Sequence, residues 1–151
     1  MKSKSTLIAA WAGLLAVLLG AVSSGCYSMK GSSSFASVEI RGHSNQQILQ
    51  TTAAVFRDDG YFLRSAVGDE LIFERAGSSL NQVAYGSWGS GVTLRVRTQI
   101  VPLGQGLSRL QCQASMVRNA GDRILEDEQW LGSFRSAPFQ SLLDETARKL
   151  K

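Results

Sequence analysis

The segment from residue 92 to residue 116 constrains the fold more than any other part of the chain. Its first half, VTLRVRTQIVP, alternates apolar and polar residues, and a second alternating stretch follows Gly104-Gln105-Gly106. A period of two places successive side chains on opposite faces of a strand, and a glycine-rich connection suits a tight hairpin. We therefore predict a β-hairpin with one buried and one polar face. The predicted buried face carries Val92, Leu94, Val96, Ile100, Leu110, Cys112, Ala114 and Met116, and the polar face carries Thr93, Arg95, Arg97, Gln99, Arg109, Gln111 and Gln113.

Shorter elements flank this hairpin. Alternation from Phe35 to Arg41 predicts a first strand, and segments 61–66 and 70–75 predict two more. The segment 76–91 is rich in Gly, Ser and Asn and is expected to form a loop. Segment 119–122 is expected to turn the chain after the hairpin. Segment 123–131 fits either a last strand or a short helix, and we favour the strand.

Two segments have the spacing of amphipathic helices. The first follows the candidate caps of residues 42–45 and ends at Asp58-Asp59-Gly60, where glycine suits the left-handed position after a helix. The second follows Ser136, a plausible N-cap, with Pro138 near its first turn. Apolar residues recur every three or four positions in both segments. They are Ile48, Leu49, Thr52, Val55 and Phe56 in the first, and Phe139, Leu142, Leu143, Thr146, Ala147 and Leu150 in the second.

The predicted order of elements is β-α-β-β-β-β-(β)-α, which indicates an α+β fold. Strands that alternate cleanly have one dry face, and two amphipathic helices packed on that face of an antiparallel sheet would cover it. The order is similar to that of the helix-grip-like domains in the lipoprotein subunit of the outer-membrane β-barrel assembly machinery. Similarity of fold does not by itself imply function.

The N-terminal segment has the three parts of a secretory signal. Lys2 and Lys4 precede an uncharged stretch from Leu7 to Val22, and small residues follow. The end of the segment, Ser24-Gly25-Cys26, resembles a bacterial lipoprotein signal, although Ser23 stands where leucine is usual. A plain signal peptide and a retained membrane anchor are the alternatives. A helix over Leu7 to Val22 would span only about 24 Å, which is short for a bilayer core of about 30 Å.

The lipoprotein resemblance implies a cellular location and a domain organisation. Residues 1–25 would be removed, Cys26 would carry the lipid, and residues 26–34 would form a flexible Ser/Gly tether to a single domain at 35–151. The resemblance implies a lipid anchor in the bacterial cell envelope. Tyr27, in place of an aspartate after the cysteine, favours the outer membrane, with the domain facing the periplasm.

The sequence contains no recognisable catalytic or metal-binding set. His43 is the single histidine, and the glycine-rich GSWGSG at 86–91 lacks the lysine of a phosphate-binding loop. Glu126-Asp127-Glu128 is interpreted as a solvated strand edge, and Cys112 as a buried apolar residue. Without Lys2 and Lys4 the chain carries 14 basic and 12 acidic residues, too balanced for a typical nucleic-acid binder. We expect no cofactor, no metal and no nucleic-acid partner.

These observations favour a non-catalytic, membrane-anchored envelope lipoprotein that binds a protein or serves as a scaffold. The candidate binding surface comprises Arg95, Arg97, Arg109, Tyr85 and Trp88. The first three share the polar face of the hairpin and would suit an anionic lipid, glycan or acidic protein, although an ordinary solvated face is the simpler interpretation. The alternative function is a periplasm-facing carrier of a small ligand, lipid or glycan, with Tyr85 or Trp88 at the mouth of a cleft. An enzyme assembled from distant segments is a third hypothesis.

Overall fold

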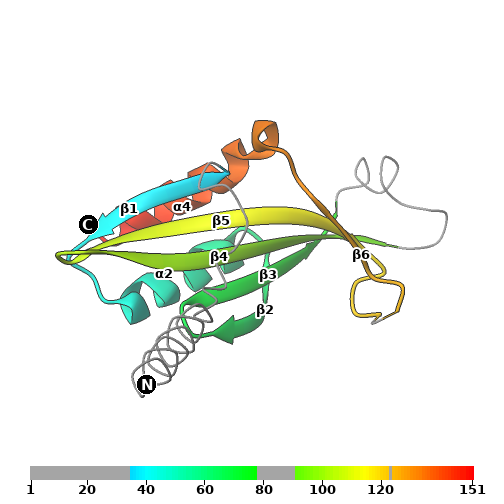
Figure 1. The fold of residues 1–151 in the computed structure, drawn as a ribbon, viewed down its shortest axis with the longest axis horizontal. Coiled ribbons are helices and arrows are strands. Elements are labelled where there is room, and N and C mark those ends of the chain that lie inside the picture. Colours follow the sequence, from blue (N-terminus) through cyan, green and yellow to red (C-terminus); the bar gives the residue numbers. More distant parts are fainter. Residues whose placement is uncertain (1–34, 78–90, 123) are drawn as a thin grey trace, which may run out of the picture. The chain divides into compact units, whose positions relative to one another are not determined.

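A six-stranded antiparallel sheet forms the framework of the computed structural model, which describes residues 35–77, 91–122 and 124–151. The predictions for Cys26, Tyr85 and Trp88, and for the signal and tether, lie outside these residues. The strands are β1 (Ala36–Arg41), β2 (Phe62–Val67), β3 (Glu70–Ala76), β4 (Val92–Gly104), β5 (Leu107–Arg118) and β6 (Asp127–Trp130). The helices are α2 (Asn45–Asp58), a short 3-10 turn η1 (Ser133–Arg135) and α4 (Ala137–Lys149). This arrangement confirms the predicted α+β fold, and β6 shows that the ambiguous segment ends as a strand (Figure 1).

The strands lie in the order β1-β5-β4-β3-β2. Strand β6 also pairs with β5, beyond the stretch of β5 that pairs with β1. Because β4 occupies the other side of β5, strands β1 and β6 share one edge of the sheet, and β2 forms the opposite edge. The described residues belong to one compact unit, and no helix among them is long and apolar enough to cross a membrane.

The central hairpin of β4 and β5 matches its prediction. Val96 lies opposite Ala114, and both are buried on the same face. The connecting residues Gln105 and Gly106 both have positive φ, at 51° and 70°. Two positive values are what a two-residue hairpin turn requires to match the right-handed twist of its strands.

Local signals set the helix boundaries. Ser44 caps α2 through a reciprocal pair of hydrogen bonds with Gln47, and Gly60 follows the helix with a φ of 84°. The predicted start of α4 is confirmed in position. Ser136 is the N-cap residue and Pro138 lies in the first turn, although the Ser136 side chain makes no capping hydrogen bond.

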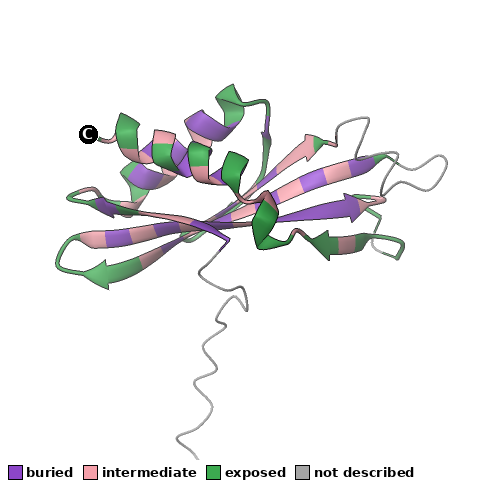
Figure 2. Cartoon of the chain, turned by 90° about the horizontal axis from the view of Figure 1, so that it is seen from above, coloured by how far each residue is buried: buried purple, intermediate pink, exposed green. Residues whose placement is uncertain are grey.

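Both helices pack on one face of the sheet (Figure 2). The ring of Phe56 from α2 stacks on Phe73 of β3 with centroids 4.5 Å apart, which fills the space between helix and sheet. Phe139 of α4 meets Phe35 at 5.4 Å beside the start of β1. Cys112 is 2 % exposed within this core, which confirms its predicted burial. Because charge is unfavourable there, burial raises the pKa of the Cys112 thiol to about 12.

Candidate functional site

The polar face of β4 carries a cluster of charged side chains that we call the Arg95 cluster: Arg95, Arg97, Glu74, Glu126 and Glu128. Arg95 reaches three carboxylates. Its Nη2 lies 2.7 Å from Glu74 Oε1, and its Nη1 lies 2.6 Å from Glu126 Oε1 and 3.4 Å from Glu128 Oε2. Arg97 Nη2 lies 2.9 Å from Glu128 Oε2. The cluster therefore joins β3, β4, β6 and the residue that precedes β6.

Hydrogen bonds within this cluster stabilise the ionised forms of Arg95 and Glu126. The hydrogen bond from Arg95, with a second from the backbone N–H of Gly121, lowers the pKa of Glu126 to about 2. The same contact raises the pKa of Arg95 above its usual value. Ser115 Oγ also donates to Glu128 Oε1 at 2.6 Å, and Ser115 is fully buried although it lies on the polar face. This end of the polar face is therefore covered by the protein itself.

The structure brings Arg95 and Arg97 together as predicted but sets Arg109 apart. Arg109 lies opposite Val101, four residues further along β4 than Arg97, and reaches Glu39 of β1 at 3.5 Å. Each of these arginines contacts a carboxylate of the chain itself, and the Arg95 side chain is only 11 % exposed. In the described part of the molecule these arginines therefore bridge strands of the sheet, and an anionic partner would have to displace the carboxylates.

The interpretation of Glu126-Asp127-Glu128 as a solvated edge holds for Glu126 and Asp127, which are exposed, but not for Glu128, which is partly buried. Side chains alternate along the segment, so Glu126 and Glu128 both turn to Arg95 while Asp127 contacts Arg118 on the other side, at 3.8 Å. The sequence did contain a signal: Glu126 and Glu128 are two residues apart, and so are Arg95 and Arg97. Their pairing depended on strand order, which periodicity does not encode.

The described residues offer little for catalysis or metal binding. His43 is partly buried in the connection between β1 and α2. Within residues 35–77, 91–122 and 124–151, no group of three or more His, Cys, Asp or Glu side chains is arranged to hold a metal ion. The three carboxylates that approach one another surround an arginine.

The two edges of the sheet differ, and sequence reasoning missed this difference. At the β1 edge, the side-chain amide of Gln140 in α4 accepts from the backbone N–H of Ser37 at 3.1 Å and donates to its carbonyl at 3.0 Å. These two bonds satisfy the outward backbone groups of Ser37, where a neighbouring strand could otherwise pair. Exposed backbone groups at a sheet edge otherwise offer a template for pairing, and proteins commonly cover them.

The β2 edge carries apolar side chains that are exposed on both faces of the sheet. Phe62 and Val67 are 77 % and 74 % exposed and lie opposite Glu74 and Glu70, on the polar face. Leu63 lies opposite Phe73, on the face of the helices, and is also exposed. A bulge at Arg64 interrupts the pairing with β3. Apart from this bulge and one exposed arginine, the described residues show none of the usual protections of an edge strand.

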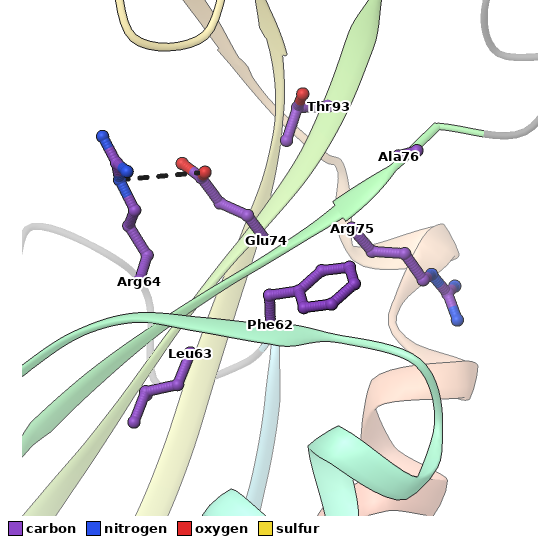
Figure 3. A pocket seen from close by; sticks show the side chains of 7 residues that line it. All are labelled: Phe62, Leu63, Arg64, Glu74, Arg75, Ala76 and Thr93. Carbon is purple, nitrogen blue, oxygen red and sulfur yellow. Dashed lines mark ion pairs between the residues drawn. The ribbon is translucent and has the colours of Figure 1, made fainter.

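A hollow of about 340 Å³ lies beside the first half of β2. Its lining combines apolar and charged side chains: Phe62, Leu63, Arg64, Glu74, Arg75, Ala76 and Thr93. Figure 3 shows Arg64 and Glu74 on one side of β2 and Leu63 on the other. The Arg64–Glu74 contact is long, at 4.0 Å, and Arg64 is largely exposed, so this pair is easily rearranged.

The β2 edge and its hollow form the candidate functional site. An edge strand with exposed apolar side chains can pair with an extended polypeptide through backbone hydrogen bonds, while pockets receive alternate side chains. No protein-family model, curated protein or solved structure matches this chain.

Proposed function

We propose that the chain is a non-catalytic envelope lipoprotein, anchored through Cys26, whose domain binds an extended segment of a partner protein along the β2 edge. The observation that supports it is the contrast between the two edges. Gln140 satisfies the backbone of β1 at Ser37, whereas β2 presents Phe62, Leu63 and Val67 to solvent. Large exposed apolar side chains gathered on one strand are typical of an interaction surface.

The partner segment is expected to be extended, with apolar side chains at alternate positions. One set would cover Phe62 and Val67 on the polar face, and the other would cover Leu63 on the helix face. Full burial of such a side chain contributes about 1.5–3 kcal/mol, so these contacts would add substantially to the backbone hydrogen bonds. The hollow at Phe62 and Arg64 would receive one side chain of the partner.

Site-specific crosslinking tests the binding edge. A photoreactive amino acid at position 62, in the full chain in its native envelope, should yield a discrete crosslinked product. Val67→Lys should abolish that product, because a lysine on an edge strand opposes strand addition. The matched control is Leu103→Lys, which alters another exposed apolar residue, near the tip of the β4–β5 hairpin, and should leave the product unchanged. An equal yield from both variants would exclude the β2 edge as the binding site.

Metabolic labelling tests the anchor. A palmitate analogue should label the natural chain and fail to label Cys26→Ala, because acylation of the lipoprotein type starts at this cysteine. Equal labelling of the two chains would remove the anchor from the proposal. The proposed binding along the β2 edge would be unaffected by that result.

The hollow beside β2 supports a second candidate function, the carriage of a small ligand. Its mixed lining suits an amphipathic molecule. Native mass spectrometry of the purified chain would then show a bound small molecule. Thr93→Trp, which fills the hollow, should remove it. A ligand that survives this substitution would argue against the hollow as its site.

A further inference from the structure

Two exposed aromatic rings lie at the β1/β6 edge of the sheet, the edge furthest from β2. Trp130 at the end of β6 is 52 % exposed, and Phe134 in η1 is 83 % exposed. Both line a second hollow of about 190 Å³. The Arg135 guanidinium lies 5.5 Å from the Phe134 ring, and Arg97 lies 5.6 Å from the Trp130 ring. We call Trp130, Phe134 and Arg135 the β6–η1 patch.

This patch lies close to the point where the described chain begins. Ala36 at the start of β1 is opposite Cys112, and Trp130 is opposite Ser115, on the same side of β5. Three residues of a strand correspond to about 10 Å. Phe35 also contacts Phe139 in the first turn of α4, directly after η1. Figures 1 and 2 both show η1 beside the start of β1.

The length of the preceding chain sets a limit on how far the domain can lie from a lipid at Cys26. Eight residues separate Cys26 from Phe35, and the nine extended steps between these two residues reach at most about 32 Å. If Cys26 carries the anchor, Phe35 therefore stays within this distance of the bilayer. Among the exposed apolar side chains that the structure describes, those of the β6–η1 patch are the nearest to Phe35 along this edge.

We propose that the β6–η1 patch rests on the surface of the bilayer that holds the anchor. The composition fits that occupant, because tryptophan, phenylalanine and arginine at one site match the interface between lipid headgroups and acyl chains. The proposal depends on the lipid anchor at Cys26 in the proposed function. It goes further by assigning the domain an orientation.

That orientation has a consequence for the candidate site. The patch lies at the β1/β6 edge, and β2 lies four strand spacings away, or about 19 Å in the plane of the sheet. A domain that rests on its β1/β6 edge therefore directs the β2 edge away from the lipid. The anchor and the partner would then occupy opposite edges of one sheet.

Cysteine accessibility tests the orientation. Phe134→Cys and the matched control Phe62→Cys would be prepared in the full, lipid-modified chain and reconstituted into vesicles of phosphatidylethanolamine and phosphatidylglycerol. Both parent side chains are largely exposed, so neither substitution should disturb the core. The parent chain gives the background, because Cys112 is buried. The probe is a membrane-impermeant maleimide applied to the outer surface, with only outward-facing molecules counted.

Position 134 should react roughly tenfold more slowly than position 62 in vesicles, because a side chain at the headgroup boundary is shielded from an impermeant reagent. The two rates should become similar in detergent that disperses the bilayer. A chain that remains with the vesicles but reacts equally at both positions would overturn the orientation alone. A chain that fails to associate with vesicles, with label appearing at Cys26, would overturn the anchor and the orientation together.

Discussion

Replacement of Arg95 by methionine should destabilise the domain more than is usual for a substitution on the polar face of a sheet. Methionine keeps most of the length of the side chain and removes the charge and the hydrogen-bond donors. In the folded protein Glu74, Glu126 and Glu128 would remain close together without the guanidinium that now lies among them. Ser115 and Gly121 would still direct two of these carboxylates toward the same space.

The geometry places the expected loss between two reference cases. Exposed ion pairs contribute up to about 1 kcal/mol, whereas removing one partner of a buried pair costs about 3–5 kcal/mol. The Arg95 side chain is 11 % exposed and its three partners are 19–27 % exposed. We therefore expect Arg95→Met to lower the free energy of unfolding by about 2–3 kcal/mol at neutral pH.

Urea unfolding, followed by circular dichroism, measures this loss. The matched control is Arg109→Met, because the ion pair that Arg109 makes among the described residues is longer, at 3.5 Å, and involves the more exposed Glu39. Its loss should stay within about 0.5 kcal/mol. A similar loss in both variants would mean that the Arg95 cluster adds nothing beyond an ordinary surface pair.

The pH dependence separates charge from packing. The folded pKa of Glu126 is about 2, below its usual 4.5, so its contribution is complete above about pH 4.5 and declines as the pH falls toward 2. In Arg95→Met the carboxylates repel one another until they are protonated. The difference in the free energy of unfolding between the natural chain and the variant should therefore become smaller below about pH 4.5. A constant difference from neutral pH to about pH 3 would refute the electrostatic explanation and indicate lost packing instead.

Three further predictions concern the core and the covered edge. Cys112, whose pKa is raised to about 12 by burial, should react with a thiol reagent only when the domain unfolds, and rapid labelling without denaturant would contradict this. Phe56→Ala should cost about 3–5 kcal/mol in urea unfolding because it removes the ring stacked on Phe73; a loss below about 1 kcal/mol would show that the core collapses around the gap. Gln140→Ala should cost about 1–2 kcal/mol and raise the rate of hydrogen exchange at the Ser37 amide, and an unchanged exchange rate would show that Gln140 does not cover the β1 edge.

Much of the fold follows from local patterns. The alternation on either side of Gly104-Gln105-Gly106 predicted the central hairpin and its buried face, because a strand has a period of two. The spacing of Ile48, Thr52 and Phe56 predicted the buried face of α2 in the same way. Segment 123–131 remained ambiguous, because β6 is only four residues long and is held by its pairing with β5.

The candidate site was much harder to predict. Nothing local distinguishes Phe62 and Val67 from residues of an inner strand, because apolar content looks the same whether a strand is covered or open. The cover on the β1 edge depends on Gln140, which is 103 residues from Ser37 in the chain. The partners of Arg95 come from segments 21, 31 and 33 residues away.

The sequence by itself determined which segments form strands and helices and which of their faces are buried, because those properties depend on neighbours within a few residues. Only the tertiary structure decided which strands lie at the edges, which edge is covered and which charges meet. Those outcomes depend on strand order and on contacts between distant segments, and the local periodicity of apolar residues contains no information about either. The functional proposals rest on that second kind of information, apart from the anchor at Cys26, which rests on a local motif alone.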